Sequence, residues 1–338
     1  MPFHTGDPTA GRPRRDRRPV VLTTTDSGRA PARSYDAGVK LDTADLRPVT
    51  DPHLRGDLRS WTDVELPGLD RRGEVYAWLP PGYDDGDERY PVVYLHDGHN
   101  VFLPERSTGG AAWEVDGAMT DLARDGIPAV VVAVPCSPTG RAEEYTQYAM
   151  PGEGGGRAAD YAAFLVDHLK PAVDAVLRTR PEPAHTVTAG SSLGGVVSAY
   201  LWERHPDVFG GAGVLSPAFW WPGEQALLDL EAALPGRAPG RVYVDVGGHE
   251  RPDDAGIERR YVEDAERLVR SLRDAGVPVR YVYDSQAHHF ESAWAERFPS
   301  AVRWLLQGYA VAPPAHVPAD PADPSGDEVP PAGTGSGT

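Results

Sequence analysis

The chain has 338 residues, 40% of them hydrophobic and 25% charged, which is enough for one sizeable hydrophobic core or two small ones. Its 50 acidic residues against 33 basic ones give a formal net charge of −17. A chain this acidic repels phosphate backbones and anionic lipid, so we expect neither nucleic acid nor a membrane surface as a partner.

The cysteine content and the hydropathy pattern indicate where the protein works. The single cysteine, Cys136, excludes an intrachain disulfide. Apolar runs all fall short of the roughly 20 residues that a membrane-spanning helix needs. The arginine-rich N-terminus is not followed by an apolar stretch of signal-peptide length. We therefore expect a soluble cytoplasmic protein.

The two ends of the chain differ in composition from the part between them. Residues 1–55 are rich in Pro, Arg, Asp and Thr without helix or strand periodicity, which predicts a disordered or loosely packed arm. Residues 312–338 are rich in Pro and Gly and have too few apolar side chains to pack, which predicts a disordered tail. One domain over residues 56–311 is expected to hold the function.

Within that domain, strand-like and helix-like segments alternate. Residues 74–80 alternate in polarity as an antiparallel strand does. The later strands are expected as short apolar runs at 90–98, 127–135, 185–190, 211–216, 241–247 and 279–284. The helices between and after them are expected at 117–126, 159–179, 194–206, 257–276 and 299–308. This alternation predicts an α/β fold whose mostly parallel sheet carries helices on both faces, with ligands bound at the carboxyl ends of the strands.

Two adjacent serines stand in a glycine-rich turn at one such strand end. The run from Gly190 to Gly194 matches G-x-S-x-G, with Ser192 at its centre, between an expected strand and an expected helix. This strand–turn–helix setting is that of a nucleophile elbow, where small neighbours let helix and strand approach closely. Ser191 lacks the symmetric glycine flanking and is expected to point into the turn. The pattern predicts Ser192 as a nucleophile.

A nucleophilic serine needs a base and an acid that orients the base. In this kind of fold the acid and then the histidine follow the serine along the chain. Glu250 follows the expected strand at 241–247, with Asp253 and Asp254 as alternatives further along the loop. Asp245 lies inside that strand and is expected to be a buried structural residue or an edge residue.

The base is expected after the last strand. The segment "VRYVYDSQAHHFESAW" offers two adjacent histidines there, His288 and His289. Spacing alone does not separate two neighbours in a loop, so both remain candidates at this point.

Several long motifs resemble one enzyme family. They are "LPPGYDDGDERYPVVYLHDGHNVF", "RAEEYT", "AGSSLGG", "HPDVFGGAGVLSPAFWW", "VDVGGHE" and "HFESAWAERFP", in that order along the chain. Over about residues 60–310 the sequence is similar to the esterase D-like family of α/β-hydrolases, which includes enterochelin esterases and feruloyl esterases. The resemblance implies an α/β-hydrolase fold and a serine esterase activity.

The resemblance also implies which loop residues act. The family's catalytic histidine stands five residues before a tryptophan, and counting back from Trp294 gives His289, with His288 as the alternative. The family's acid falls three residues after the glycine that ends the strand, and counting from Gly247 gives Glu250.

The tetrahedral intermediate of ester cleavage needs hydrogen-bond donors for its oxyanion. The Leu193 amide, next after the nucleophile, is expected to be one, and Gly98 or His99 in the loop after an earlier strand the other. His99 replaces the glutamine common in the family. This difference is expected to alter the polarity near the oxyanion hole without changing the geometry of its backbone. Cys136 stands where the family often has asparagine and is expected to be a small buried filler.

The substrate pocket is expected to have aromatic walls, although aromatic residues at such positions are as often part of a core. The expected lining residues are Trp113, Tyr145, Trp220 and Trp221. Arg141 and Glu144 are expected to form an ion pair that frames the site or pins a loop. No cluster with metal-ligand spacing occurs, so neither a metal nor another cofactor is predicted.

These features together predict a serine carboxylesterase that cleaves a small-molecule ester, short-chain or aromatic, through an acyl-enzyme. The alternatives are an acyltransferase of the same architecture, in which an alcohol replaces water, and a siderophore trilactone hydrolase.

Overall fold

The computed structural model describes residues 38–221, 223–236 and 240–308. Its strands are β1 (Arg47–Pro48), β2 (Asp57–Leu66), β3 (Arg71–Leu79), β4 (Val92–Leu95), β5 (Val130–Ala133), β6 (Ala149–Met150), β7 (Gly154–Gly155), β8 (Thr186–Ser191), β9 (Gly211–Leu215), β10 (Arg241–His249) and β11 (Val279–His288). Its α-helices are α1 (Val115–Arg124), α2 (Arg141–Tyr145), α3 (Ala158–Ala163), α4 (Lys170–Val176), α5 (Leu193–Arg204), α6 (Gln225–Ala233), α7 (Ala255–Asp274) and α8 (Glu291–Leu305). A π-helical segment, Phe164–Leu169, joins α3 to α4.

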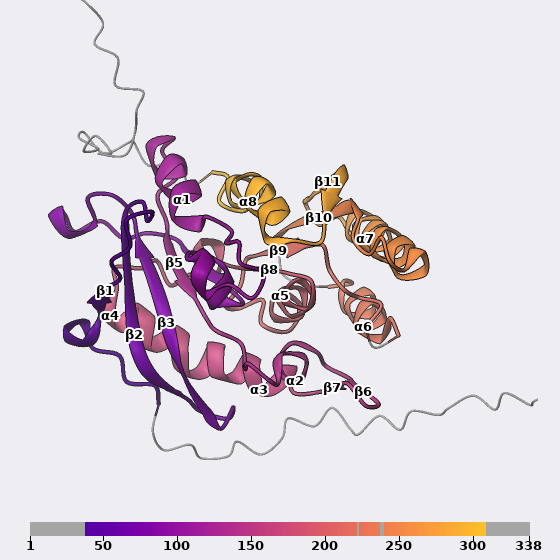
Figure 1. The fold of residues 1–338 in the computed structure, drawn as a ribbon, viewed down its shortest axis with the longest axis horizontal. Helices are drawn as coiled ribbons and strands as arrows, with labels where there is room; N and C mark the ends of the chain where they lie inside the picture. Colours follow the sequence, from indigo (N-terminus) through magenta and orange to yellow (C-terminus); the bar gives the residue numbers. More distant parts are fainter. Residues whose placement is uncertain (1–37, 222, 237–239, 309–338) are drawn as a thin grey trace, which may run out of the picture. The chain divides into compact units, whose positions relative to one another are not determined.

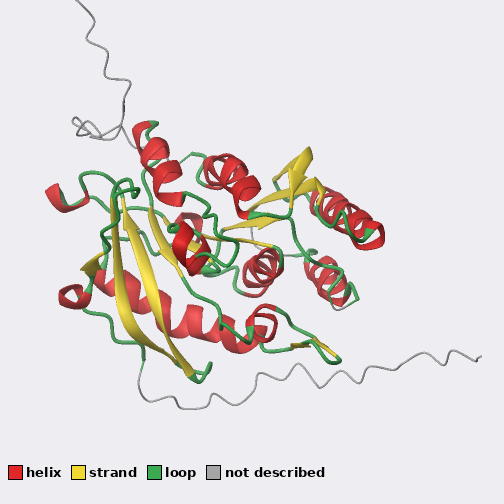
Figure 2. Ribbon diagram, in the orientation of Figure 1, coloured by secondary structure: helices red, strands yellow, loops and turns green. Residues whose placement is uncertain are grey.

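In the described residues the strands form a nine-stranded sheet in the order β1-β2-β3-β5-β4-β8-β9-β10-β11, and a two-stranded ribbon of β6 and β7 (Figures 1 and 2). Pairing is antiparallel from β1 through β2 and β3 to β5. Every pairing from β5 through β4, β8, β9 and β10 to β11 is parallel. The predicted α/β fold with a mostly parallel sheet is confirmed.

The alternation of side chains along the buried strands produces two cores. Val92 and Tyr94 of β4 belong to one core, which contains residues of α3, α5, α6 and α7. Val93 and Leu95 of the same strand belong to the other, which contains residues of α1 and α8. Because successive strand side chains point to opposite faces, helices cover both faces of the sheet (Figure 1). The carboxyl ends of the parallel strands thereby remain free to present loops.

The boundary predicted for the N-terminal arm is wrong for residues 38–55. Leu46 is 8% exposed within the first core, and β1 pairs with β2. The indole N–H of Trp61 donates to the Asp42 carbonyl at 2.8 Å. This segment therefore packs on the sheet through Leu46, through partly buried apolar residues and through backbone pairing, which its polar composition concealed. Residues 1–37 of the expected arm and the expected tail at 312–338 lie outside the described residues.

Several elements differ from the sequence expectations, among them α2, α6, β1, β6 and β7, which were not predicted. For two others the physical reason is clear. Strand β2 was not predicted, because its register shifts between Trp61 and Val64 and the shift breaks the alternation of polarity. Helix α8 begins at Glu291 and continues through Pro299, where the sequence predicted its start. None of the helices in the described part of the chain is both long and apolar enough to cross a membrane.

Candidate active site

Ser192 occupies a strained turn between β8 and α5. Its backbone has φ 59° and ψ −123°, and its amide donates to the Leu215 carbonyl at 3.0 Å. Such a conformation costs a non-glycine residue about 1–3 kcal/mol and is typical of functional turns. A Cβ on Gly190 would lie 2.9 Å from the carbonyl carbon of Gly194, so the close approach of strand and helix requires glycine there. Ser191 is buried and Ser192 only half-buried, which leaves the Ser192 side chain as the accessible hydroxyl of the two.

Glu250 and His289 are in contact in the loops after β10 and β11. Nδ1 of His289 lies 2.5 Å from Oε2 of Glu250, whose side chain is fully buried. The other carboxylate oxygen, Oε1, accepts from the Gly247 amide at 2.5 Å and from the Ser216 hydroxyl at 2.6 Å. Burial alone would raise the pKa of Glu250, but the bonds from His289, Ser216 and Gly247 outweigh it and lower that pKa. The carboxylate is therefore held ionised beside the imidazole.

The alternative acids are engaged elsewhere. Asp253 is an exposed side chain paired with Arg251 at 3.1 Å. Asp254 is the N-cap of α7, where its side chain accepts two backbone N–H groups. Asp245 is fully buried and lies 3.1 Å from Arg297, which agrees with its expected structural role.

The adjacent histidine faces away from this contact. The ring of His288 stacks on that of His249, with centroids 5.1 Å apart and planes 25° from parallel. Of the two histidines, the fold therefore brings His289 to the buried carboxylate, because consecutive residues at a strand end point to opposite sides.

The loop after β4 holds the predicted oxyanion donors, and one of them is already occupied. The Gly98 amide donates to the Val134 carbonyl at 2.9 Å, so the prediction of Gly98 as a donor is wrong. A Cβ on Gly98 would lie 2.9 Å from the Ala133 carbonyl carbon, which explains the glycine as a packing requirement. The His99 amide follows it in the same loop, and Leu193 is the first residue of α5.

Arg141 joins this loop to the serine turn. Its guanidinium makes two 2.8 Å hydrogen bonds to the Asp97 carboxylate and donates to the Ser191 carbonyl at 3.3 Å. Asp97 itself has a left-handed backbone, φ 54°, and its amide donates to the Tyr145 hydroxyl at 2.9 Å. The buried Cys136 thiol lies near the same carboxylate, and burial raises the pKa of that thiol. Through Arg141, Asp97 thus links the loop after β4 to the turn that carries Ser192.

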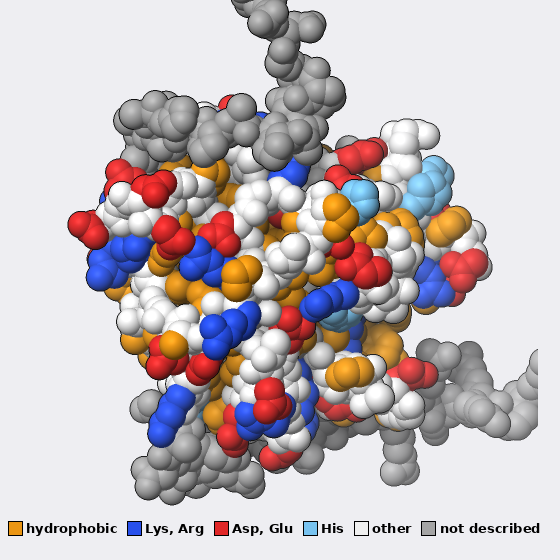
Figure 3. Space-filling view, turned by 60° about the vertical axis from the view of Figure 1, so that its left-hand side comes forward, with side chains coloured by type: hydrophobic (Ala, Val, Ile, Leu, Met, Phe, Trp, Pro, Cys, Tyr) orange, Lys and Arg blue, Asp and Glu red, His pale blue; other side chains and the backbone are white. Residues whose placement is uncertain are grey.

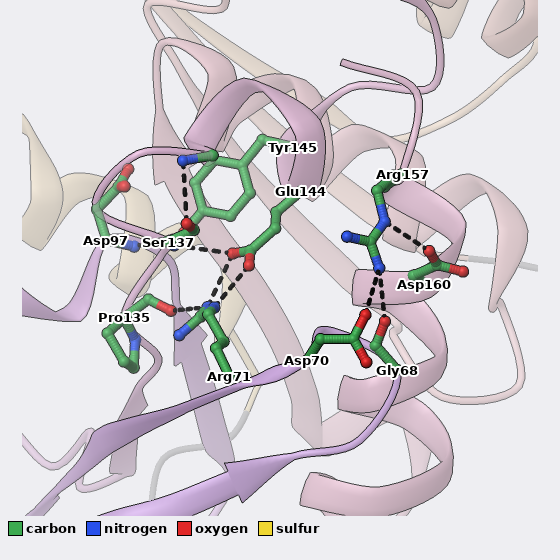
Figure 4. Close-up of polar contacts among 11 residues, drawn as sticks. Gly68, Asp70, Arg71, Asp97, Pro135, Ser137, Glu144, Tyr145, Arg157 and Asp160 are labelled. Atoms are coloured by element: carbon green, nitrogen blue, oxygen red, sulfur yellow. Dashed lines mark hydrogen bonds and ion pairs between the residues drawn. The ribbon is translucent and has the colours of Figure 1, made fainter. Parts of the chain in front are cut away.

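The ion pair predicted between Arg141 and Glu144 does not form among the described residues. Glu144 is buried and pairs with Arg71 of β3 at 2.6 Å, and its carboxylate also accepts from the Ser137 amide at 3.0 Å (Figure 4). Figure 4 also shows Tyr145 directed at the Asp97 backbone. Glu144 and Tyr145 therefore stabilise the loop beneath the site, and the expectation that Tyr145 lines a pocket is wrong because its side chain has no exposed surface.

The tryptophans expected in the pocket separate into two groups. Trp113 is 3% exposed and packs against Trp294 and Phe298, with centroids 5.8 and 5.9 Å away, so it belongs to the core. Trp220 and Trp221 are half-buried and lie on the loop that follows β9. Only this second pair keeps surface that a ligand can contact.

Tyr261 on α7 is a residue that the sequence analysis missed. Its ring centroid lies 5.0 Å from that of His289 and 5.9 Å from that of Trp220. Its hydroxyl lies near the Ser192 side chain, and burial raises the pKa of the phenol, which stays protonated. On an amphipathic helix a tyrosine reads as a core residue, so no local signal distinguished it.

Acidic and basic side chains are interspersed on the face drawn in Figure 3, without a continuous patch of one sign. In the described residues no group of three or more His, Cys, Asp or Glu side chains is placed to hold a metal ion.

A mostly parallel sheet with a strand–serine–helix turn, and with a carboxylate and a histidine after two later strands, defines an α/β-hydrolase. The "Putative esterase" family model matches residues 67–305, and the chain belongs to this family. The protein is accordingly a carboxylic ester hydrolase.

Two relatives are similar in sequence. Uncharacterized protein YbbA of Bacillus subtilis (strain 168) is 23% identical over 244 residues, which cover 70% of this chain and 92% of that protein. An endo-1,4-beta-xylanase/feruloyl esterase of Xylanibacter ruminicola is 27% identical over 224 residues, which cover 63% of this chain and only 27% of that longer protein.

Solved structures share the fold. An IroE-like serine hydrolase from Shewanella oneidensis superposes with a TM-score of 0.62 at 20% identity, over 72% of this chain and 79% of that one. The enterobactin esterase FES from Shigella flexneri superposes with a TM-score of 0.58 at 20% identity, over 78% of this chain and 62% of that one.

Proposed function

We propose that the protein is a serine carboxylesterase that cleaves short-chain or aromatic esters through an acyl-enzyme. Ser192 is the nucleophile, His289 the general base and Glu250 the acid that orients it. The observation that carries the proposal is the 2.5 Å contact between His289 and the buried Glu250, in a molecule whose Ser192 is held in a strained, half-buried turn. Family membership supplies ester hydrolysis as the reaction.

In the first half-reaction, Nε2 of His289 accepts the Ser192 hydroxyl proton while Oγ forms a bond to the ester carbonyl carbon. The carbonyl oxygen becomes an oxyanion, for which the Leu193 and His99 amides are the proposed donors. Collapse of this intermediate breaks the bond to the alcohol oxygen, which takes the proton from His289. Glu250, ionised and bound to Nδ1, stabilises the imidazolium that forms in between.

In the second half-reaction, water replaces the alcohol. His289 removes a proton from the water, the hydroxide oxygen bonds to the acyl carbon, and the bond to Ser192 Oγ breaks with return of the proton to Oγ. The carboxylic acid leaves and the resting state is restored. An alcohol in place of water would give the acyltransferase that the sequence also allowed.

The proposal is tested by covalent trapping. A fluorophosphonate should phosphonylate the wild-type chain once, with loss of fluoride and of esterase activity, because only an activated serine attacks phosphorus at a useful rate. Intact mass and peptide mapping should place the adduct on the peptide that contains both serines. Ser191→Ala should be labelled as fast as wild type and Ser192→Ala should not be labelled there. Labelling that survives Ser192→Ala would contradict the proposal.

The aromatic wall predicts which acyl groups are accepted. Trp220 and Trp221 present rigid faces beside Tyr261, and aromatic contacts contribute about 0.5–1.5 kcal/mol beyond area burial. We expect kcat/KM for p-nitrophenyl esters to be higher from acetyl to butyryl than for palmitoyl, and higher for a feruloyl ester in wild type than in Trp220→Ala.

The control for this measurement is Trp113→Ala, which should lower stability without changing selectivity because Trp113 is a core residue. A kcat/KM that rises beyond octanoyl, or selectivity that follows Trp113 and not Trp220, would refute the aromatic wall. A trilactone siderophore and an added acceptor alcohol in the same panel separate the two alternative activities by their products.

A further inference from the structure

Ser216, just past the end of β9, lies in a backbone conformation that disfavours serine. Its φ is 39°, a left-handed value that glycine adopts without strain, and the residue is completely buried. A side chain kept at such a position at a cost in backbone energy points to a use for that side chain. The Ser216 hydroxyl is therefore the group to account for.

The three hydrogen bonds of this hydroxyl fix where its proton points. Oγ of Ser216 accepts from the Trp294 indole N–H at 3.0 Å and from Nη2 of Arg297 at 3.0 Å. Both groups can only donate, and a serine hydroxyl has one proton and two lone pairs. The single proton is thus left for Oε1 of Glu250, 2.6 Å away. Every hydrogen-bonding position of the hydroxyl is used.

The same bond fixes how Glu250 meets the histidine. Oε1 receives Ser216 together with the Gly247 amide at 2.5 Å, so the carboxylate presents its other oxygen, Oε2, to His289. Without Ser216, the buried carboxylate would be held on the Oε1 side by one backbone donor. The Glu250 carboxylate could then rotate about its last side-chain bond, and the His289 ring would no longer be held in one orientation.

A buried positive charge stands behind the hydroxyl. Nε of Arg297 lies 3.1 Å from Oδ2 of Asp245, and Oδ1 of Asp245 accepts from the Ser216 amide at 3.1 Å. Arg297 is 5% exposed, so its charge is weakly screened and polarises the hydroxyl toward Glu250. The chain Arg297–Ser216–Glu250–His289 is one connected network built from α8, β9 and two loops.

We propose that Ser216 is a positioning residue of the esterase reaction, which directs its proton to Glu250 and transmits the charge of Arg297 to the Glu250–His289 pair. The inference rests on the proposed function, because it assigns Ser216 a role only through Glu250 and His289. It places a fourth side chain behind the nucleophile, base and acid, just past the end of β9, which supplies none of those three.

The titration of the pair makes this role measurable. The charged or titratable groups around Glu250 are His289, Asp245 and Tyr261, together with Arg297, which reaches it through Ser216. A donor to a carboxylate favours its ionised form, so loss of the Ser216 hydroxyl raises the proton affinity of the Glu250–His289 pair. Activity should then begin to fall at a higher pH as the solution is acidified.

The test compares Ser216→Gly and Ser216→Ala with wild type. Glycine relieves the positive φ and alanine keeps it, whereas both lose the hydroxyl, so a defect that they share belongs to the hydroxyl. We expect kcat to fall by about 10–100-fold with little change in KM, since a hydrogen bond to a charged group is lost. The acid limb of kcat/KM should move to higher pH by about one unit. Ser216→Cys, a weaker donor, should lie between these variants and wild type.

A matched control is Ser60→Ala. Ser60 is also buried and its hydroxyl donates to a carboxylate, that of Glu74, at 2.7 Å, but it lies on β2, in the antiparallel part of the sheet. It should lose stability without a shift of the acid limb. Because burial raises the pKa of Asp245 to about 6, the profiles are repeated with Asp245→Asn, where the shift caused by Ser216→Gly should persist.

Folded Ser216→Gly and Ser216→Ala variants with the wild-type pH profile overturn the inference. So does failure of all three Ser216 variants to fold, which would make the residue purely structural. If Ser192→Ala or His289→Ala keeps full activity, the proposed function fails instead, so the two failures are distinguished by variants measured in the same assay.

Discussion

Replacing Ser192 with alanine should lower kcat/KM for p-nitrophenyl acetate by about 10⁶-fold, the loss found when a triad nucleophile is removed from a serine hydrolase. The expected loss is this large because no other group can form the bond to the acyl carbon, and the remaining members of the triad act only through that serine. Alanine keeps the backbone of the turn, whose amide bond to Leu215 does not involve the side chain. The thermal midpoint should therefore stay close to that of wild type.

The neighbouring serine provides the control. Ser191 is buried at the end of β8 and its carbonyl, not its hydroxyl, contacts Arg141. Ser191→Ala should keep its activity within a small factor of wild type. An active Ser192→Ala variant, assayed after removal of any contaminating host esterase, would move the nucleophile elsewhere.

Replacing His289 with alanine should cost about as much as removal of the nucleophile, because the proton transfer is shared between the two residues. His288→Ala separates this effect from a general disturbance of the loop. Its ring stacks on His249, and it is His289 that contacts Glu250, so this variant should stay close to wild type in kcat and KM. The measurement is kcat/KM for both variants at one pH, with thermal unfolding alongside.

The opposite order of activities of these two variants would contradict the assignment of the base. If His288→Ala is inactive and His289→Ala is active, the base has been assigned one residue too far along the chain. If both are inactive and both unfold early, the loop is structural, and imidazole added to His289→Ala would be the remaining way to show a base by chemical rescue.

Local patterns were sufficient for most of the sheet and for the turn at Ser192. Apolar runs marked the buried strands because a strand covered on both faces has no polar side. The turn between β8 and α5 could be predicted because it is a local feature, made of one strand end, one turn and one helix start. His289 and Glu250 could not be selected in the same way, because hydrophobic periodicity does not predict the conformation of a loop. The choice of these two residues over their neighbours came from the family resemblance.

Contacts between distant segments account for the errors. Arg71 and Glu144 are 73 residues apart in sequence, and no local pattern pairs them or withdraws Glu144 from Arg141. Trp113 was expected to line the pocket, but α8 brings Phe298 against it. Ser216 lay inside a motif already quoted for the family, yet the partners of its hydroxyl come from two later parts of the chain, the loop of Glu250 and helix α8. Each of these depends on which helix covers which strand, and that is decided by the tertiary fold.

The buried Cys136 has a practical consequence for fluorescence studies of this enzyme's dynamics. It is the chain's only thiol, it is 7% exposed, and burial raises its pKa so that little thiolate is present near neutral pH. Maleimides should therefore not label the native protein. A single cysteine introduced on an exposed loop, such as the one that carries Thr108, would accept a fluorophore without any need to remove Cys136 from beneath the site. The enzyme is thus already suited to site-specific labelling.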